Sequence, residues 1–215
     1  MKNKSIVGIS VFIIYLIIPM ILNMFLPALN KCTKPELFLY FIVYAAVIIL
    51  FLSIYRKSLS EDFKKIKKNK KNFFLTIIIC LILSFVTMAI GSIISSLIVG
   101  KNTDTNDFAV NTLFDTIPAF MLFNTLIYAP IVEEIVFRKT FYDILDNKTF
   151  FVIFSAIVFG FYHIGYNFVA LKEFANMIPY IFMGTVLASS YIKTKSIYAP
   201  ITVHFLYNLI ILFVK

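Results

Sequence analysis

The chain has few charged residues. Asp, Glu, Lys and Arg make up 14% of its 215 residues, hydrophobic residues make up 60%, and the mean hydropathy is +0.91. A water-soluble domain usually has about a quarter of its residues charged. The low charge excludes an ordinary soluble domain and predicts an all-α, polytopic membrane bundle, a single integral membrane domain over residues 1–215. The apolar runs are continuous, which excludes a transmembrane β-barrel, whose strands alternate over about 10 residues.

Cysteine and histidine are also scarce. Cys32 and Cys80 form neither a Cys-x-x-Cys pair nor a disulfide framework. The two histidines, His163 and His204, both lie in apolar segments. Ionisable groups are costly at membrane depth, so their presence there indicates a functional site. The net charge of +9 does not indicate a nucleic-acid partner, because most Lys and Arg residues flank apolar segments, as membrane topology requires.

The apolar runs predict about seven membrane spans, with six to eight allowed, since a helix needs about 20 apolar residues to cross the bilayer. The expected spans are 6–29, 37–55, 73–99, 116–145, 149–170, 177–192 and 197–214. No small-residue cleavage site follows the first run, so we expect it to remain as an uncleaved span. A polar break is expected at 100–112, between the third and fourth spans.

Positive charge is concentrated in the segment 56–72, between the second and third spans. We expect this segment to be a basic cytoplasmic loop, either flexible or a helix on the membrane surface, that contacts anionic lipid. Most of the 20 Lys and Arg residues lie in segments on the same side as the N-terminus. This asymmetry predicts a multi-pass protein of the cell membrane with a cytoplasmic N-terminus. No oligomeric state follows from the sequence.

Two adjacent glutamates lie inside the fourth expected span. Glu134 and Arg138 are four residues apart, so they can form an ion pair on one helix face. Glu133 points about 100° away from Glu134 in a helix that has 3.6 residues per turn. We therefore expect Glu134 to be structural and Glu133 to be available for chemistry.

Polar residues of two later spans are expected at a similar depth. Phe159 is one turn before His163 and can pack against its ring, and His204 shares a helix face with Asn208. With a rise of about 1.5 Å per residue, Glu133, His163 and Asn208 each lie roughly 20 Å from the nearest turn on one side of the membrane. The sequence therefore predicts one polar site built from three helices.

The three motifs resemble those of a known family. Glu-Glu-x-x-x-Arg at 133–138, Phe-x-x-x-His at 159–163 and His-x-x-x-Asn at 204–208 are similar to the motifs of the CPBP (Abi) family. That family contains type II CAAX prenyl proteases and related bacteriocin-processing and self-immunity proteins. The resemblance covers residues 110–214, the expected protease core. It implies an intramembrane endopeptidase that acts on a peptide or protein in or at the membrane.

The resemblance also implies roles for these residues. Glu133 and His163 would activate a water, and His204 and Asn208 would stabilise the oxyanion. The supporting residues would hold the site together: Glu134, Arg138 and Phe159. Peptide hydrolysis does require a base for water and donors aimed at the developing oxyanion.

A metal-dependent mechanism is the alternative. Glu133, His163 and His204 would then bind a divalent metal such as zinc, leaving the fourth position for water. The chain has no His-Glu-x-x-His motif, and these three residues come from different spans. We therefore expect catalysis without a metal cofactor.

Two other function classes are compatible with these residues. Buried Glu, His and Arg also occur in proton-coupled transporters, although those distribute polar residues along a path. A non-catalytic membrane immunity or scaffold protein could retain the same residues. Abundant Ile, Lys, Asn and Phe indicate an AT-rich bacterial genome, which favours a secreted peptide or bacteriocin precursor over a prenylated substrate.

Overall fold

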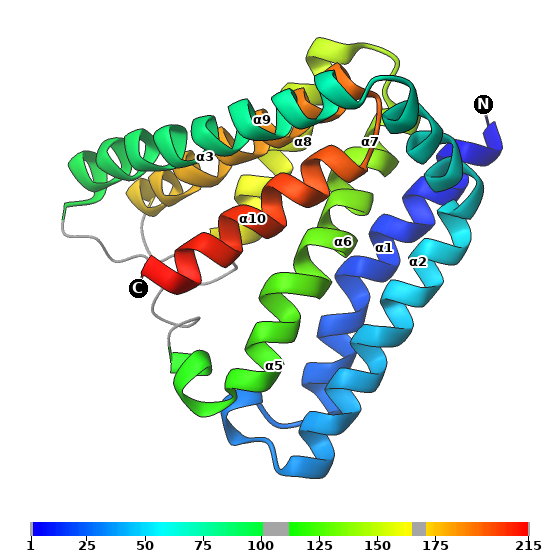
Figure 1. The fold of residues 1–215 in the computed structure, drawn as a ribbon. Coiled ribbons are helices and arrows are strands. Elements are labelled where there is room, and N and C mark those ends of the chain that lie inside the picture. The colour runs from blue at the N-terminus through cyan, green and yellow to red at the C-terminus, as the bar shows by residue number, and fades with distance from the viewer. Residues whose placement is uncertain (1, 101–111, 165–170, 215) are drawn as a thin grey trace.

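The computed structural model describes residues 2–100, 112–164 and 171–214, and these residues form a bundle of helices without strands (Figure 1). The all-α membrane fold expected from the sequence is confirmed. Four helical segments are long and apolar enough to cross a membrane. They are α1 (Lys2–Phe25), α2 (Lys34–Lys68), α3 (Lys70–Val99) and the composite helix Pro118–Ile144.

Three further long helices complete the described bundle. They are α8 (Lys148–Ile164), α9 (Met177–Thr194) and α10 (Tyr198–Val214). Each of the seven expected spans thus has a helical segment, although α8 and α10 are shorter than the four long candidates. The expected break at 100–112 and the end of the fifth span, 165–170, lie almost wholly or wholly outside the described residues.

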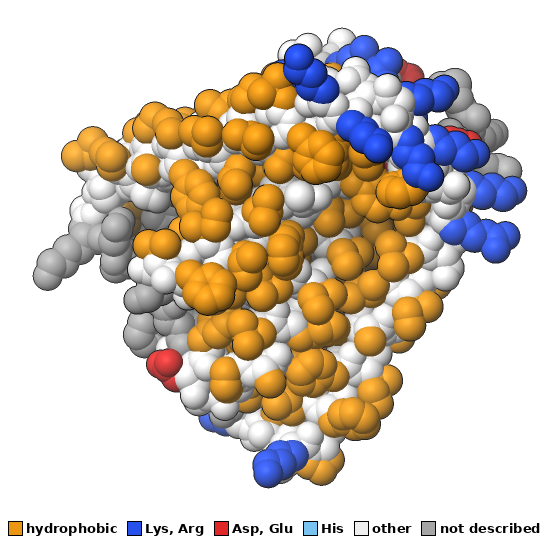
Figure 2. Space-filling view, viewed as in Figure 1, with side chains coloured by type: hydrophobic (Ala, Val, Ile, Leu, Met, Phe, Trp, Pro, Cys, Tyr) orange, Lys and Arg blue, Asp and Glu red, His pale blue; other side chains and the backbone are white. Residues whose placement is uncertain are grey.

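The surface supports a membrane setting. In the face drawn in Figure 2, hydrophobic side chains cover most of the molecule, and Lys and Arg side chains gather at one end. Large apolar side chains such as Ile49 and Ile93 are 65% and 60% exposed, as expected for groups that contact lipid. Which side of the membrane the basic end faces stays a prediction.

The helix of the second span extends beyond residue 55, so most of 56–72 is helical, which is one of the two forms expected for this segment. Helix α2 continues to Lys68, a break at Asn69 follows, and α3 begins at Lys70. The helix continues because residues 56–68 contain neither Gly nor Pro and are rich in Lys, which has a high helix propensity. At its other end, α2 starts with a capping box, in which the Thr33 N–H donates to the Glu36 carboxylate at 2.7 Å.

Two positive residues counted toward the membrane orientation are buried. Arg138 is 0% exposed and Lys139 is 8% exposed, so neither belongs to a charged loop. The Lys139 ammonium lies 3.2 Å from an Asp143 carboxylate oxygen and donates to the Tyr191 hydroxyl at 3.3 Å. The topology prediction therefore rests on the other basic residues, above all those at 56–71.

The composite helix changes its winding around the two glutamates. Its parts in chain order are α5 (Pro118–Phe123), the π-helical segment η2 (Asn124–Tyr128), α6 (Ala129–Glu134), the π-helical segment η3 (Ile135–Thr140) and α7 (Phe141–Ile144). Pro130 lacks a backbone N–H and cannot continue the α-helical hydrogen bonding. Glu133 and Glu134 thus lie between two π-helical segments, which occur often at functional sites.

Close helix contacts position the second half of the chain. Helix α9 packs against α8, α3 and α10. A Cβ atom at Gly91 of α3 would lie 2.6 Å from Pro179 Cα, and one at Gly160 of α8 would lie 3.1 Å from the Met177 carbonyl oxygen. These positions need glycine because the backbone of α9 approaches so closely.

Polar contacts fasten α2 to the second half of the chain. Asp62 is 1% exposed and accepts a hydrogen bond from the Ile197 N–H at 3.0 Å, directly before α10. Lys65 bonds to Asp62 at 2.6 Å and donates to the Lys195 carbonyl at 2.9 Å. The C-terminal end of α2 is therefore bound to the turn between α9 and α10.

Candidate active site

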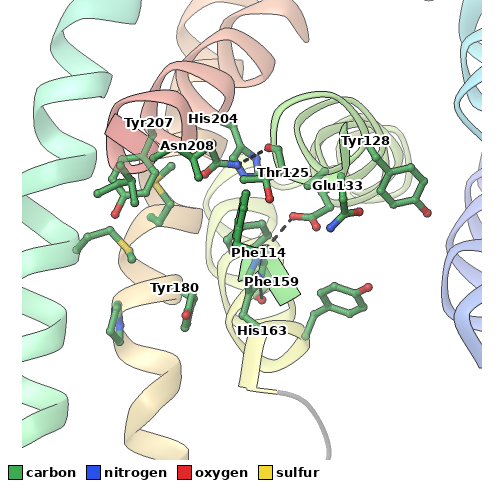
Figure 3. A pocket seen from close by; sticks show the side chains of 18 of the residues that line it. Phe114, Thr125, Tyr128, Glu133, Phe159, His163, Tyr180, His204, Tyr207 and Asn208 are labelled. Carbon is green, nitrogen blue, oxygen red and sulfur yellow. Dashed lines mark hydrogen bonds and ion pairs between the residues drawn. The ribbon is translucent and has the colours of Figure 1, made fainter. Parts of the chain in front are cut away.

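The four predicted catalytic residues line one cavity of about 1140 Å³. Glu133 comes from α6, His163 from α8, and His204 and Asn208 from α10, and all four side chains are gathered in Figure 3. The structure therefore brings together the three helices that the depth argument expected to meet. Tyr180 of α9 lines the same cavity.

Glu133 and His163 face each other across a short gap. His163 Nε2 lies 3.8 Å from Glu133 Oε2, which is too long for a direct hydrogen bond. Polar atoms at such a separation are commonly bridged by a water. Glu133 is 7% exposed. The pair is therefore a suitable place for one water between a carboxylate and an imidazole.

The His163 ring is held on both faces and at one nitrogen. Nδ1 donates to the Phe159 carbonyl at 2.8 Å, because a carbonyl can only accept. The ring centroid is 4.2 Å from that of Phe159, and the ring stacks on Tyr180 at 4.7 Å. The expected Phe159 contact is present. With its proton on Nδ1, a neutral His163 presents Nε2 to Glu133 as an acceptor.

Glu134 bridges Arg138 and His204. Its Oε2 lies 3.2 Å from Arg138 Nε, and its Oε1 accepts a hydrogen bond from His204 Nδ1 at 2.9 Å. The expected Glu134–Arg138 pair is present, and both side chains are fully buried. The bond to His204 was not expected, because it joins α6 to α10 and no spacing rule within a helix reveals such a contact.

The Arg138 guanidinium has further partners in the core. It donates to the Gly184 carbonyl at 3.3 Å and lies 4.4 Å from the centroid of the Phe159 ring. A guanidinium at this distance from an aromatic face is attracted to it. Arg138 thus connects the Glu134 carboxylate to α8 and α9.

The protonation of His204 limits what it can donate. Its Nδ1 proton is used in the bond to Glu134, so Nε2 can donate only in the imidazolium form. Asn208 donates from Nδ2 to the Thr125 carbonyl at 2.8 Å. Because an amide NH₂ has two hydrogens, the second one remains available to the cavity.

The alternative metal site is not assembled in the described part of the chain. Over these residues no group of three His, Cys, Asp or Glu side chains could hold a metal ion. His204 Nδ1 is bonded to Glu134, whereas His163 Nε2 faces Glu133. The set Glu133, His163 and His204 therefore does not fit a metal in this arrangement, and we derive no catalytic step from one.

The chain is similar to a known protein family and to several individual proteins. Residues 115–210 match the family described as type II CAAX prenyl endopeptidase Rce1-like. The chain is 24% identical over 224 residues to "Membrane-embedded CAAX protease MroQ" of Staphylococcus aureus (strain USA300), covering 95% of this chain and 85% of that protein. It is 26% identical over 218 residues to "UPF0177 protein YvdC" of Lactococcus lactis subsp. lactis (strain IL1403), covering 95% and 79%.

A third relative matches over a shorter region. The chain is 28% identical over 113 residues to "Putative membrane peptidase YdiL" of Bacillus subtilis (strain 168), and the match covers 51% of this chain and 42% of that protein. No solved structure matches the chain. The family resemblance seen in the three motifs is confirmed: residues 115–210 are similar to the Rce1-like family of type II CAAX prenyl endopeptidases.

Proposed function

We propose that this protein is an intramembrane endopeptidase that hydrolyses peptide bonds of a peptide or protein in or at the cell membrane. The observation that carries the proposal is the Glu133–His163 pair, whose facing atoms are 3.8 Å apart beside a cavity of about 1140 Å³. The names of two relatives, a membrane-embedded CAAX protease and a membrane peptidase, support the same reaction class.

The pair can hold and activate a water. A water in the gap donates one hydrogen bond to the Glu133 carboxylate and one to His163 Nε2, which leaves an oxygen lone pair for the substrate carbonyl. Glu133 takes the proton as the oxygen attacks, and the same proton then passes to the leaving amine. The bond from His163 Nδ1 to Phe159 keeps Nε2 in the acceptor form that this step needs.

His204 and Asn208 are the proposed oxyanion donors. Asn208 contributes its second amide hydrogen, and His204 contributes Nε2–H in the imidazolium form. An imidazolium at His204, together with Arg138, balances the two buried carboxylates of Glu133 and Glu134. Charge balance favours this form, because an uncompensated buried charge is costly.

Glu134, Arg138 and Phe159 are the proposed supporting residues. Glu134 fixes the His204 ring through Nδ1, much as an acidic residue orients a catalytic histidine in hydrolases. Arg138 neutralises Glu134, and Phe159 fixes His163. We propose a glutamic mechanism without a metal. The side chains that could bind a metal are divided between two pairs, Glu133 with His163 and Glu134 with His204.

The cavity lining favours an apolar substrate segment. Besides the polar site residues, it includes apolar side chains of α3 and α9 such as Phe85, Met88 and Met183. Such walls suit a hydrophobic stretch of a peptide better than a charged one. We propose a secreted or signalling peptide precursor as substrate and a cytoplasmic N-terminus for the enzyme.

The test is proteolysis by the purified full chain in detergent against a library of membrane peptides. Glu133→Ala is compared with wild type, and Glu61→Ala, which removes an exposed glutamate of α2, is the matched control. Cleavage by wild type and Glu61→Ala, lost in Glu133→Ala and kept with a chelator, supports the glutamic mechanism. Loss with the chelator and recovery with zinc would instead require a metal.

Wild-type activity in a correctly inserted Glu133→Ala protein would overturn the catalytic assignment. Absence of cleavage by the wild-type chain over the whole library would favour the non-catalytic immunity or scaffold function.

A further inference from the structure

The first 114 residues lie outside the segment that matches the family, yet α1 lies against the helix that carries the two glutamates. Helix α1 packs along η3 and α7, and Figure 1 shows α1 beside the composite helix. Its residue Tyr15 is 1% exposed and points into the core. Tyr15 is therefore a residue of the N-terminal half that can act on the site.

The Tyr15 ring lies in the layer directly next to the site. Its centroid is 5.6 Å from Phe137 in an edge-to-face arrangement and 4.9 Å from Tyr162. Phe137 in turn contacts Phe159 at 5.4 Å, and Tyr162 is the neighbour of His163. The aromatic packing fixes the ring, so the position of its hydroxyl is also fixed.

The hydroxyl of Tyr15 reaches the neighbourhood of Glu133. The two side chains are close enough to interact, and Tyr162, whose ring centroid is 4.9 Å from that of Tyr15, is a second polar neighbour of the Tyr15 hydroxyl. The Tyr15 oxygen is nevertheless buried without a hydrogen bond of ordinary geometry to any described residue, and the same is true of Glu133 Oε2. Buried polar atoms almost always have a partner. Glu133 Oε2 faces His163 across the proposed water, so the Tyr15 hydroxyl is the atom that still needs an explanation.

We propose that Tyr15 is a positioning residue for Glu133. Its hydroxyl donates to the Glu133 carboxyl and keeps the carboxyl plane turned toward His163. This inference rests on the proposed function, in which Glu133 is the base. A carboxyl group rotates about its terminal bond in a broad energy well, so a donor on one side is needed to fix it. A fixed base matters because small displacements of reacting groups reduce the rate strongly.

The test replaces only the hydroxyl. Tyr15→Phe removes the donor, p-fluorophenylalanine fills the volume without a donor, and p-aminophenylalanine restores an N–H at the same position. Tyr40→Phe is the matched control, because Tyr40 is a buried tyrosine of α2 whose hydroxyl bonds to the Pro27 carbonyl, away from the cavity lining. Each full-length variant is assayed in detergent with a peptide that wild type cleaves, and kcat and KM are measured separately.

We expect Tyr15→Phe to lower kcat by about tenfold or more with KM nearly unchanged, p-aminophenylalanine to recover most of the loss, and Tyr40→Phe to behave as wild type. If Tyr15→Phe does not insert, the p-fluoro and p-amino proteins decide the question. A wild-type kcat in a donor-free variant would overturn the positioning role, and so would a loss that the amino group does not recover.

The two proposals fail in different ways. If wild type cleaves no peptide or Glu133→Ala stays active, the proposed function is wrong, and the positioning role is lost with it. If Glu133 is required but the Tyr15 hydroxyl is not, only the positioning role is wrong.

Discussion

Asn208 of α10 donates a hydrogen bond to the backbone carbonyl of Thr125 at 2.8 Å. This carbonyl has no helical donor. Four residues on, the Ala129 N–H is bonded to the Asn124 carbonyl, and five residues on, Pro130 has no N–H. The asparagine of the third motif therefore satisfies a carbonyl that the proline leaves unpaired, and it ties α10 to the composite helix beside the cavity.

Asn208→Ala should lower the free energy of unfolding by about 1–3 kcal/mol, because it leaves the part-buried Thr125 carbonyl without its donor. In the background of Pro130→Ala, which adds an N–H at residue 130, the cost of Asn208→Ala should be smaller. A double-mutant cycle measured by reversible unfolding in detergent gives this coupling. Equal costs in both backgrounds would mean that the stabilisation by Asn208 does not depend on the N–H that Pro130 lacks.

Arg138→Met should destabilise the protein by about 3–5 kcal/mol, because it leaves the Glu134 carboxylate buried without its guanidinium partner. The double variant Glu134→Gln with Arg138→Met should lose less, since no unpaired charge remains. The unfolding free energy in detergent and the fraction of inserted protein are the measurements. A double variant less stable than Arg138→Met alone would contradict this account.

The sequence predicted contacts within single helices better than it predicted the helix ends. Spacing within one helix was sufficient for the Glu134–Arg138 and Phe159–His163 contacts, because residues four apart share a face. Distances to the turns then brought Glu133, His163 and Asn208 to one depth. The bond between His204 and Glu134 could not be predicted, since it depends on how α10 packs on α6.

Helix α2 extends past the expected end of the second span for a different reason. Charge was taken to mark the end of the second span, but a charged segment without Gly or Pro can continue as a helix beyond the membrane. In that segment Leu59 and Asp62 are buried and Ile66 packs against the core. The partner of Asp62, the Ile197 N–H, lies 135 residues away in the sequence.

Asp62→Ala should weaken the contact between α2 and the turn that precedes α10. The variant removes the acceptor of the Ile197 N–H and the partner of Lys65, and we expect a loss of about 1–3 kcal/mol. Hydrogen exchange at Ile197 should become faster than in wild type. Glu61→Ala, at the exposed neighbouring position, should leave that exchange unchanged. If the Ile197 amide exchanged as slowly in Asp62→Ala as in wild type, the hydrogen bond to Asp62 would not protect it.

Gly91→Ala should separate α3 from α9. The added Cβ would lie 2.6 Å from Pro179 Cα and 2.9 Å from Pro179 N, and backbone atoms cannot move aside as a side chain can. Because Pro179 and Tyr180 both line the cavity, the displacement should reduce activity as well as stability. We expect a loss of about 1–3 kcal/mol, typical of overpacking, measured by thermal unfolding in detergent together with the peptidase assay.

Gly8→Ala is the matched control for Gly91→Ala. Its Cβ would meet the side-chain atoms Ile144 Cδ1 and Thr140 Cγ2 at 3.0 Å, and the end of the isoleucine can turn away. The substitution should therefore cost less than Gly91→Ala and leave the cavity intact. If both alanine variants lost the same stability, close backbone contact between α3 and α9 would not be what the glycine at 91 provides.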